Sequence, residues 1–431
     1  MKVSVATVFP DLYENFLKTS LIKRAQEDKI VEFDVTGFSS FCDPKERLDG
    51  PTVGHGTGMA IRPEVVERVV DTQEKKHGKA LKIFLTPQGK KLDQPLVQEL
   101  AQKAQEQKHV MLFAARYEGI DERAHQEYAD YEVSIGDYIL MGGDLPAMVL
   151  LESLLRYVPG VVAQKESVDK DSFSGAFLDF PTYTTPPREW KGHKIPEVLL
   201  SGDHAKMEAF RKDQAVTKTV KEHFAWARSH CTEKEDRTLI KEKIPNHYVA
   251  LLHHDVLIGG DQVGTSSVTS LDVHDIARSS CTYGIEHYFI ATPLEDQQKI
   301  VNKMLQFWAE SGVEYNKNRS EAVELVSVVD RLDDAIKKIE EKEGKRPVVV
   351  GTSARKMGDA ELISYHEQAK VWKEDRPVLF IFGTARGITQ ELLSSCDYLL
   401  MPVEGFTHFN HLSVRSAVAI ILDRWMGINL Y

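Results

Sequence analysis

The feature of this sequence that most constrains its fold is a regular alternation of apolar strand patterns with amphipathic helical patterns. In the first 160 residues the strand patterns lie at 3–9, 31–37, 81–85, 110–114 and 133–135. The helical patterns that alternate with them lie at 12–26, 63–75, 94–107 and 147–157. Strands separated by single helices predict a parallel sheet with helices on both faces. The sequence therefore predicts an α/β domain here.

The alternation begins again at residue 247, which predicts a second α/β domain. Its strand patterns lie at 249–252, 287–291, 325–329, 347–351, 378–382 and 398–402. Its helical patterns lie at 295–310, 331–343, 360–372, 390–394 and 412–425. A polar segment without periodicity and then a helical, basic segment separate the two series. We therefore expect four parts, at 1–160, 161–185, 186–245 and 246–431, and we expect the last to fold by itself.

Glycine-rich and charged turns in the first series indicate where a ligand would bind. After the strand pattern at 110–114, two arginines and three acids occur within eight residues. The next strand pattern is followed by the turns Gly136-Asp137 and Gly142-Gly143-Asp144. Open α/β sheets bind ligands at the carboxyl ends of their strands. At this level, ordinary turns with solvated charges are the alternative.

Composition and charge narrow the class of protein. The chain has 42% hydrophobic and 28% charged residues, which is typical of a soluble globular protein. It has no signal-peptide pattern and no apolar run of the roughly 20 residues that span a bilayer, so we expect a cytoplasmic protein. Its four cysteines are widely spaced without a CxxC pair, which argues against zinc and disulfides.

The charge distribution leaves nucleic-acid binding open. The net charge of −11 is unusual for a protein that binds nucleic acid. Residues 188–221, however, contain eight basic and five acidic residues. Such a segment can dock a phosphate backbone, whereas a solvated helix face would have a similar composition.

Three blocks of sequence resemble the signature blocks of one family. They are LTPQGKKLDQ (85–94), RYEGIDER (116–123) and SIGDYILMGGDLPAM (134–148). Together they resemble the bacterial tRNA (guanine-37-N1)-methyltransferase family, TrmD. The resemblance implies a SPOUT-type parallel sheet with a deep trefoil knot and a small helical tRNA-binding domain. It also implies S-adenosylmethionine (SAM) as methyl donor, S-adenosylhomocysteine as product, and a homodimer that acts on tRNA, not on DNA or at a membrane. It admits Mg²⁺ as an additional ion.

The resemblance places the SAM site in three loops. The residues that it implies are Thr86, Pro87, Gln88, Gly89, Ala115, Ser134, Ile135, Gly136, Asp137, Tyr138, Ile139, Leu140, Gly142, Gly143 and Pro146. Two positions depart from the family pattern, because Ala115 and His55 stand where the family usually has glycine. His55 belongs to VGHGTGM (53–59), whose G-x-G-x-G spacing is weak as a dinucleotide loop.

The resemblance also implies the residues that act on the target guanine. Asp171 matches the general base that takes the N1 proton, and Arg156 matches the group that stabilises charge on O6. Glu118, Arg116 and Tyr117 match the residues that hold the target guanine. A free aspartate, with a pKa of about 3.9, is a weak base for such a proton. We therefore favour a route in which Arg156 makes N1 more acidic by drawing charge from O6. In the family, the linker that bears this aspartate is thought to complete the neighbouring subunit's site, and we expect Arg156 to serve its own chain.

Three blocks of the second series, at 275–292, 379–388 and 399–422, resemble general SPOUT motifs. The segment is similar to a SAM-dependent RNA methyltransferase domain that is sometimes fused to TrmD. The residues implied around its cofactor are Gly383, Thr384, Gly387, Met401, Pro402, Leu412 and Ser413. Candidate RNA contacts are Arg278 here and Lys194 and Arg211 in the basic segment.

Alternative functions remain for the second half and for the chain as a whole. The second half could be a non-catalytic RNA-binding or dimerising module that kept the fold. A nicotinamide-dependent enzyme is disfavoured, because no G-x-G-x-x-G follows a strand. The pairs His253-His254 and His408/His411 lack acid or cysteine partners at ligand spacing, so we expect no metal site.

Overall fold

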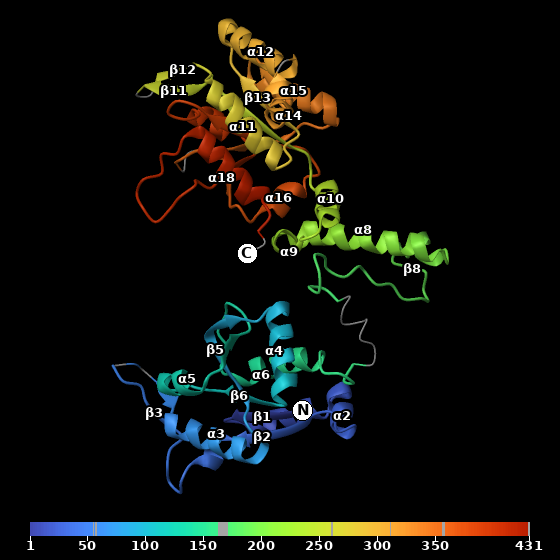
Figure 1. Cartoon of the computed structure of the whole chain (residues 1–431), viewed down its shortest axis with the longest axis vertical. Helices are drawn as coiled ribbons and strands as arrows, with labels where there is room; N and C mark the ends of the chain where they lie inside the picture. Colours follow the sequence, from blue (N-terminus) through green and yellow to red (C-terminus); the bar gives the residue numbers. More distant parts are fainter. Residues whose placement is uncertain are drawn as a thin grey trace. The chain divides into compact units, whose positions relative to one another are not determined.

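The computed structural model describes residues 1–54, 56, 58–162, 171–259, 262–310, 312–355 and 358–429. Two compact units make up the chain, Met1–Ser174 and Gly175–Tyr431 (Figure 1). We call them the first and the second unit and describe each by itself. Among the described residues, no helix is both long and apolar enough to cross a membrane.

A five-stranded parallel sheet forms the centre of the first unit. Its strands are β1 (Lys2–Thr7), β2 (Glu32–Gly37), β5 (Leu81–Lys91), β6 (His109–Ala114) and β7 (Tyr131–Ser134). They are ordered β2-β1-β6-β5-β7, and every neighbouring pair is parallel. All six residues of β6 are buried, as in a sheet that is covered on both faces. The expected parallel α/β architecture is therefore confirmed.

Helices cover the two faces of this sheet. They are α1 (Tyr13–Leu17), α2 (Ser20–Glu27), α3 (Pro63–His77), α4 (Gln94–Gln107), α5 (Glu122–Tyr128) and α6 (Asp144–Leu155). One buried cluster contains the apolar residues of α4 and α6, and another those of α3. The single helix expected at 12–26 is wrong, because Thr19 is extended (φ −83°, ψ 134°) and separates α1 from α2. No sequence pattern indicated α5.

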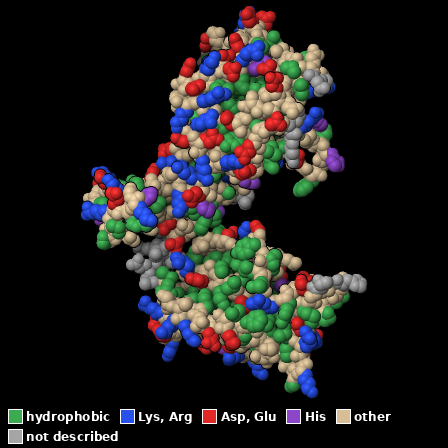
Figure 2. All heavy atoms as spheres, turned by 180° about the vertical axis from the view of Figure 1, so that it is seen from behind, with side chains coloured by type: hydrophobic (Ala, Val, Ile, Leu, Met, Phe, Trp, Pro, Cys, Tyr) green, Lys and Arg blue, Asp and Glu red, His purple; other side chains and the backbone are tan. Residues whose placement is uncertain are grey.

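Hydrophobic side chains gather on one outer face of the first unit, as the space-filling view shows (Figure 2). The large apolar side chains that this unit exposes include Phe9, Leu12, Met141, Leu145 and Val149. Two of these residues contact Arg116: the Phe9 ring lies 4.8 Å from its guanidinium, which donates to the Met141 carbonyl at 3.3 Å. Leu145 and Val149 lie one turn apart on α6. We call these five residues the apolar patch, and exposed patches of this kind mark interaction surfaces.

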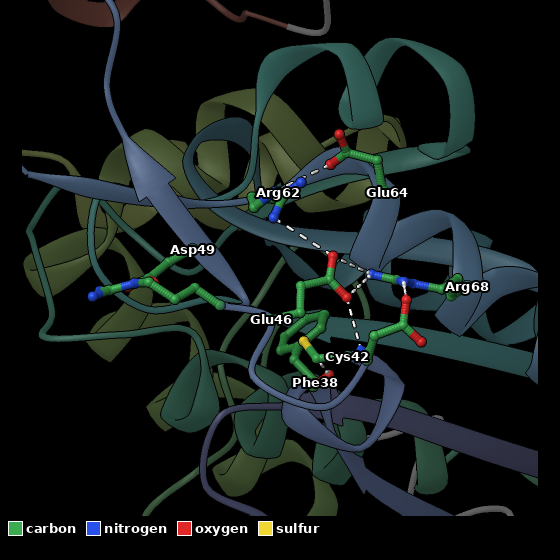
Figure 3. A network of polar contacts seen from close by, with 9 residues as sticks. Phe38, Cys42, Glu46, Asp49, Arg62, Glu64 and Arg68 are labelled. Carbon is green, nitrogen blue, oxygen red and sulfur yellow. Dashed lines mark hydrogen bonds and ion pairs between the residues drawn. The ribbon is translucent and has the colours of Figure 1, made fainter.

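A polar network fastens the chain before the hairpin of β3 (Asp49–Pro51) and β4 (Met59–Ile61) to α3 (Figure 3). The Glu46 carboxylate accepts hydrogen bonds from Nη2 of Arg68 at 2.8 and 2.9 Å, and Nη1 of Arg62 approaches it to 3.5 Å. The Arg68 hydrogen bond is the main reason why the pKa of the Glu46 carboxyl group is lowered. The network thereby fixes the chain that enters β3 against α3.

The second unit contains a seven-stranded parallel sheet. Its strands are β10 (His247–Leu252), β13 (His287–Ala291), β14 (Val326–Val329), β15 (Val348–Gly351), β16 (Glu361–Ile363), β17 (Val378–Gly383) and β18 (Tyr398–Leu400). Their order is β14-β13-β10-β17-β15-β18-β16, and the neighbouring pairs are parallel. The series β13-β10-β17-β15-β18 repeats the order of the first sheet. It makes β15, β17 and β18 the counterparts of β5, β6 and β7.

The helices that accompany this sheet are α11 (Ser270–Thr282), α12 (Glu295–Glu310), α13 (Gly312–Tyr315), α14 (Lys317–Val323), α15 (Leu332–Glu343), α16 (Gln368–Trp372), α17 (Gln390–Ser394) and α18 (Val414–Met426). A hairpin of β11 (Val256–Gly259) and β12 (Gln262–Gly264) follows β10. The helix expected at 360–372 is wrong in its first part, where β16 pairs with β18 instead. Pairing at the sheet edge overrides the local helical pattern there.

A helical segment at 175–245 packs onto the second sheet and its helices. Its elements are β8 (Glu189–Trp190), β9 (His193–Lys194), α8 (His204–Glu222), α9 (Phe224–His230) and α10 (Lys234–Lys243). Val216, Val220 and Phe224 belong to the same buried cluster as Trp372 and Trp425. The rings of Phe224 and Trp372 lie 4.7 Å apart. The helical segment therefore shares one core with the second sheet, while the four-part division of the chain stays a prediction.

Arg228 of α9 joins the helical segment to the end of α18. Its guanidinium donates hydrogen bonds to the carbonyl oxygens of Asp423 at 2.9 Å, Arg424 at 2.7 Å and Gly427 at 2.5 Å. The last carbonyls of a helix have no partner within the helix. The Asp423 carbonyl also accepts from the Gly427 N–H at 2.8 Å, so Arg228 adds a second donor there and supplies a donor to the Arg424 carbonyl.

Candidate functional site

A cavity of about 570 Å³ opens at the carboxyl ends of β5, β6 and β7. Its walls come from three stretches of chain, at 85–88, 115–125 and 133–146. The volume lies in the range of small-molecule and cofactor sites, and this edge is where open α/β sheets bind ligands. The three blocks noted in the sequence thus meet at one place.

Most of the cofactor residues implied by the resemblance line this cavity. They are Thr86, Pro87, Gln88, Ala115, Ser134, Ile135, Gly136, Tyr138, Ile139, Leu140, Gly142, Gly143 and Pro146. Arg116, Tyr117 and Glu118, which are expected to hold the base, line it as well. Gly89 and Asp137 are not part of the lining. The exposed Asp137 carboxylate instead pairs with Lys91 at 2.7 Å.

Residues 86–89 leave the β ladder as a bulge between two pairings. Leu85 and Lys90 both pair with Val133 of β7, so the residues between them project from the sheet. A Cβ atom on Gly89 would lie 2.4 Å from the backbone nitrogen of Val133. Gly89 therefore closes the bulge and presents residues 86–88 to the cavity, without lining the cavity itself.

Gly142 and Gly143 allow the loop after β7 to approach the loop after β6. The Gly143 N–H donates to the Ala115 carbonyl at 2.7 Å. A Cβ atom on Gly142 would lie 2.5 Å from Cδ of Arg116, and one on Gly143 would lie 2.9 Å from the Ala115 nitrogen. Two walls of the cavity are thus in close contact, and a side chain at either glycine would force these walls apart.

A buried acid behind the cavity wall was not expected from the sequence. Asp144 begins α6 and is only 2% exposed. Its carboxylate accepts hydrogen bonds from the Thr7 hydroxyl, from the Tyr13 hydroxyl at 3.4 Å and from Nε of Arg116 at 3.3 Å. Burial and the Asp144 charge raise the pKa of Tyr13, so its hydroxyl remains a donor. The network holds Arg116 at the cavity, and its only sign in the sequence is an acid that opens an apolar helix.

One of the two departures from the family pattern belongs to this wall. Ala115 lines the cavity but is only 8% exposed and belongs to the buried cluster beside α3. We therefore expect its methyl group to be accommodated. His55 lies outside the described residues. On the described part of the same hairpin, the Met59 carbonyl accepts from the Glu118 N–H at 2.9 Å, so the hairpin abuts a residue expected to hold the base.

Arg156 and Asp171 form an ion pair within one chain, between Nη2 and Oδ2. Their side chains are 46% and 37% exposed, and neither residue lines the cavity. Arg156 follows the last residue of α6, whereas the first turn of α6 contributes to the cavity wall. A helix of 12 residues is about 18 Å long. The Arg156 backbone therefore lies about 15 Å along α6 from Pro146, which lines the cavity of the same chain.

In the second unit, the expected cofactor residues lie at the corresponding strand ends. They are Gly383, Thr384 and Gly387 at the end of β17, and Met401, Pro402, Leu412 and Ser413 between β18 and α18. The Thr384 hydroxyl donates to the Leu252 carbonyl at 2.9 Å, and Ser413 caps α18. A Cβ atom on Gly383 would lie 2.7 Å from the Ile388 nitrogen, so this glycine is needed for the turn itself.

The expected RNA contacts are at least partly exposed. Arg278 lies in α11, about 12 Å along the helix from its first residue. Lys194 of β9 lies 3.8 Å from Glu189, and the Arg211 guanidinium of α8 lies 4.9 Å from the Phe180 ring centroid. Over the described part of the chain, no group of three or more His, Cys, Asp or Glu side chains is placed to hold a metal ion.

Two parallel sheets share a series of five strands in the same order, and the first has a glycine-walled cavity at its carboxyl edge. Together they define a two-part α/β protein with a cofactor-sized site. Residues 1–227 match the family model described as tRNA (Guanine-1)-methyltransferase TrmD. Residues 246–427 match the model described as SAM-dependent RNA methyltransferase. The chain belongs to the TrmD family of tRNA (guanine-1)-methyltransferases, and the expected SAM-dependent enzyme class is confirmed.

Relatives match this chain over two different lengths. The tRNA (guanine-N(1)-)-methyltransferases of Nitratidesulfovibrio vulgaris and Oleidesulfovibrio alaskensis are each 35% identical to it, with 99% of both chains covered. The protein of the same name from Thermotoga maritima is 42% identical over 51% of this chain and 87% of its own length. The second half is thus shared with the first two relatives, whereas the match to the third covers about half of this chain.

Proposed function

We propose that the first unit, together with the helical segment, transfers a methyl group from SAM to N1 of guanine 37 in tRNA. The observation that carries this proposal is the cavity, because it gathers residues from all three blocks that resemble the family. The names of the matching relatives support the same reaction. A SPOUT-type arrangement with a knotted chain is our proposal for the finer description of the fold.

The reaction is tested with a tRNA transcript, SAM and the full chain. Nucleoside mass spectrometry should find 1-methylguanosine, and nuclease mapping should place it at position 37. A transcript with adenosine at that position is the matched control and should stay unmodified. Methylation of a different atom or a different guanine would contradict the proposal.

The cavity residues fit SAM. Main-chain N–H and C=O groups can recognise the edges of adenine, and glycines allow the chain to come close to a ligand. Gly143→Ala should weaken SAM binding at least about tenfold, because the new Cβ atom would press on the backbone of the opposite wall. Calorimetry measures the affinity, with Gly175→Ala as control, since a Cβ atom there meets nothing within 4 Å. Equal affinity in both variants would show that these loops do not form the site.

Bound in the cavity, SAM supplies an electrophilic methyl group. The Asp171 carboxylate takes the proton from N1 of guanine, and the N1 electron pair then forms the bond to the methyl carbon. SAM would supply this methyl group with loss of its carbon–sulfur bond, and S-adenosylhomocysteine would be the leaving product. We assign the Arg156 guanidinium to the negative charge that develops on O6. Glu118 and Arg116, which line the cavity, orient the base.

A homodimer would bring the proton-transfer pair to a cavity. Because neither Arg156 nor Asp171 lines the cavity of its own chain, and Arg156 follows the end of α6 that is opposite to the cavity, we propose that they serve the cavity of a second copy. The apolar patch adjoins the cavity through Arg116 and offers a surface that the second copy would cover. In such a dimer each chain completes the site of the other.

The basic segment is proposed to hold the phosphate backbone of tRNA. Arg211 and Lys218 lie two turns apart on α8, and Lys194 lies on β9. Replacing all three with glutamate should weaken tRNA binding. It should also make the slope of log affinity against log salt concentration less steep, by about 0.9 for each phosphate that is no longer neutralised. Filter binding over a series of salt concentrations measures the slope, with the exposed Lys303→Glu on α12 as control. A slope equal to that of the parent would identify the segment as a solvated face.

The second unit is proposed to be a second SAM-dependent RNA methyltransferase. Its family match supports this, as does the position of its expected cofactor residues after β17 and β18, the counterparts of β6 and β7. Thr352, which follows β15 and donates to the Ile381 carbonyl at 2.8 Å, was not expected and corresponds to Thr86 after Leu85. Calorimetry on the full chain should find two SAM sites. If calorimetry finds only one SAM site, the second unit is better explained by the alternative, a non-catalytic module.

Two further expectations stay proposals. Mg²⁺ would take part if the methylation rate depends on the concentration of that ion when SAM and tRNA are saturating. A cytoplasmic location would be shown by fractionation of cells that produce the protein.

A further inference from the structure

The loop that leads from β18 into α18 holds aromatic rings out to solvent. Phe406 is fully exposed and Phe409 is 72% exposed. The His411 ring lies edge-on to Phe409, with ring centroids 5.5 Å apart. The loop is anchored, because Nδ2 of Asn410 donates to the Ala354 carbonyl at 2.6 Å. Proteins usually bury phenylalanine, so exposed rings on an anchored loop indicate a binding surface.

Two exposed arginines lie on the neighbouring loops. Arg355 follows β15, next to the residue that anchors the aromatic loop, and Arg386 follows β17. In the sheet, β15 lies between β17 and β18, so the three loops are neighbours at the carboxyl edge. Within the described ranges, neither guanidinium has an ion-pair partner. The aromatic loop itself contains one acid, Glu404. Cationic and aromatic groups therefore gather at one edge.

We propose that this surface, formed by residues 404–412 with Arg355 and Arg386, binds an unpaired nucleotide in the RNA substrate of the second unit. The inference rests on the proposed function of that unit and names the part of the RNA that it recognises. Every base has a face that stacks on an aromatic ring, and guanidinium groups bind phosphates. Paired RNA keeps its bases stacked inside the helix. The surface therefore selects a loop, bulge or single-stranded end.

The position of the surface fits a methyl acceptor. Met401 and Pro402 precede residues 404–412, Leu412 is the last of them, and Ser413 follows. These are the residues expected around the second cofactor, so a base stacked on Phe406 or Phe409 lies on the same loop as the proposed methyl-donor site. The surface would thus present the base to be modified.

The test uses the full chain and a short single-stranded RNA that contains 2-aminopurine, whose fluorescence reports stacking. Phe406→Ala/Phe409→Ala should lower the affinity for this RNA by about tenfold or more and reduce the fluorescence change, since two stacking platforms are removed. Affinity for the same RNA in a duplex should not change. Phe307→Ala, at a phenylalanine that is 47% exposed on α12, is the matched control. Phe406→Trp/Phe409→Trp should restore stacking.

A second pair of substitutions tests the cations. Arg355→Glu/Arg386→Glu should flatten the log–log salt dependence of single-strand binding by about 0.7 for each arginine. Guanine-N1 methylation by the first unit should be unaffected in all these variants. Parental affinity in the double alanine variant would overturn the inference. So would a changed oligomeric state in light scattering with unchanged RNA affinity, because the loop would then be a contact between copies.

The inference and the proposed function can fail separately. Phe-dependent stacking together with a second SAM site supports both. Phe-dependent stacking with only one SAM site in the full chain supports the nucleotide surface and overturns the second methyltransferase.

Discussion

Asp171→Ala is expected to lower the rate of guanine methylation by a factor of about 10²–10⁴, which is the usual contribution of a general base. SAM affinity should stay nearly unchanged, because Asp171 does not line the cavity. Asp171→Asn is the sharper variant, since it retains an acceptor for Arg156 but cannot take the proton. Single-turnover kinetics measure the rate, and Glu152→Ala, at an exposed acid of α6, is the control. An asparagine variant within about tenfold of the parental rate would exclude Asp171 as the base.

Mixed dimers show which cavity each residue serves. Three variants are combined in pairs after subunit exchange: Gly143→Val, which blocks the cavity, Arg156→Ala and Asp171→Ala. If Arg156 and Asp171 both act on the partner's cavity, a mixed dimer of Gly143→Val with either Arg156→Ala or Asp171→Ala should have one working site. A mixed dimer of Arg156→Ala with Asp171→Ala should then have none. If Arg156 serves its own chain, as expected from the sequence, Arg156→Ala with Asp171→Ala should restore one site. Failure of every mixture would refute the shared site.

Residues 246–431 alone are expected to unfold at a temperature more than about 10 °C below that of residues 175–431. The shorter segment lacks Val216, Val220 and Phe224, which fill the core beside Trp372 and Trp425. Each buried side chain of this size contributes about 1.5–3 kcal/mol, whereas the whole stability of a domain is only about 5–15 kcal/mol. Loss of the helical segment should therefore remove much of the stability of the second unit.

Calorimetric unfolding of the two segments measures this difference. A point variant of the full chain separates packing from chain length: Arg228→Ala should lower the transition of the second unit, because α18 loses the donor to its last carbonyls. Lys303→Ala, at an exposed residue of α12, should not. If the two segments unfold within a few degrees of each other, the second sheet folds without the helical segment, as the sequence alone predicted.

Much of the fold could be predicted because periodicity reports burial directly. The patterns at 94–107, 287–291, 295–310 and 390–394 coincide with α4, β13, α12 and α17. The failures lie where non-local contacts decide the structure, as in β16, which exists because it pairs with β18. The core that the helical segment shares with the second sheet also depends on non-local contacts. No local pattern indicates which other element will cover Val216 or Phe224.

The candidate site divides in the same way. Its lining could be predicted because the resemblance is carried by contiguous blocks, and each block forms one wall. The Asp144 network could not be predicted, because Thr7, Tyr13 and Arg116 are all distant from Asp144 in the sequence and only the folded sheet brings them to it. The ion pair joins Asp171, which the resemblance assigned to the neighbouring subunit's site, to Arg156, which we expected to serve its own chain. Its position in one chain changes which mixed dimers should be active.

The bulge at residues 86–89 has a consequence for affinity. Both of its ends pair with the same residue of β7, and Gly89 is wedged against that strand. The conformational entropy of the loop is therefore lost when the sheet folds, not when a ligand arrives. When the wall of a binding site is already rigid, binding a ligand costs little additional conformational entropy, and the dissociation constant is lower for that reason. Substitutions that loosen the bulge should hence raise the dissociation constant even when every group that touches the ligand is retained.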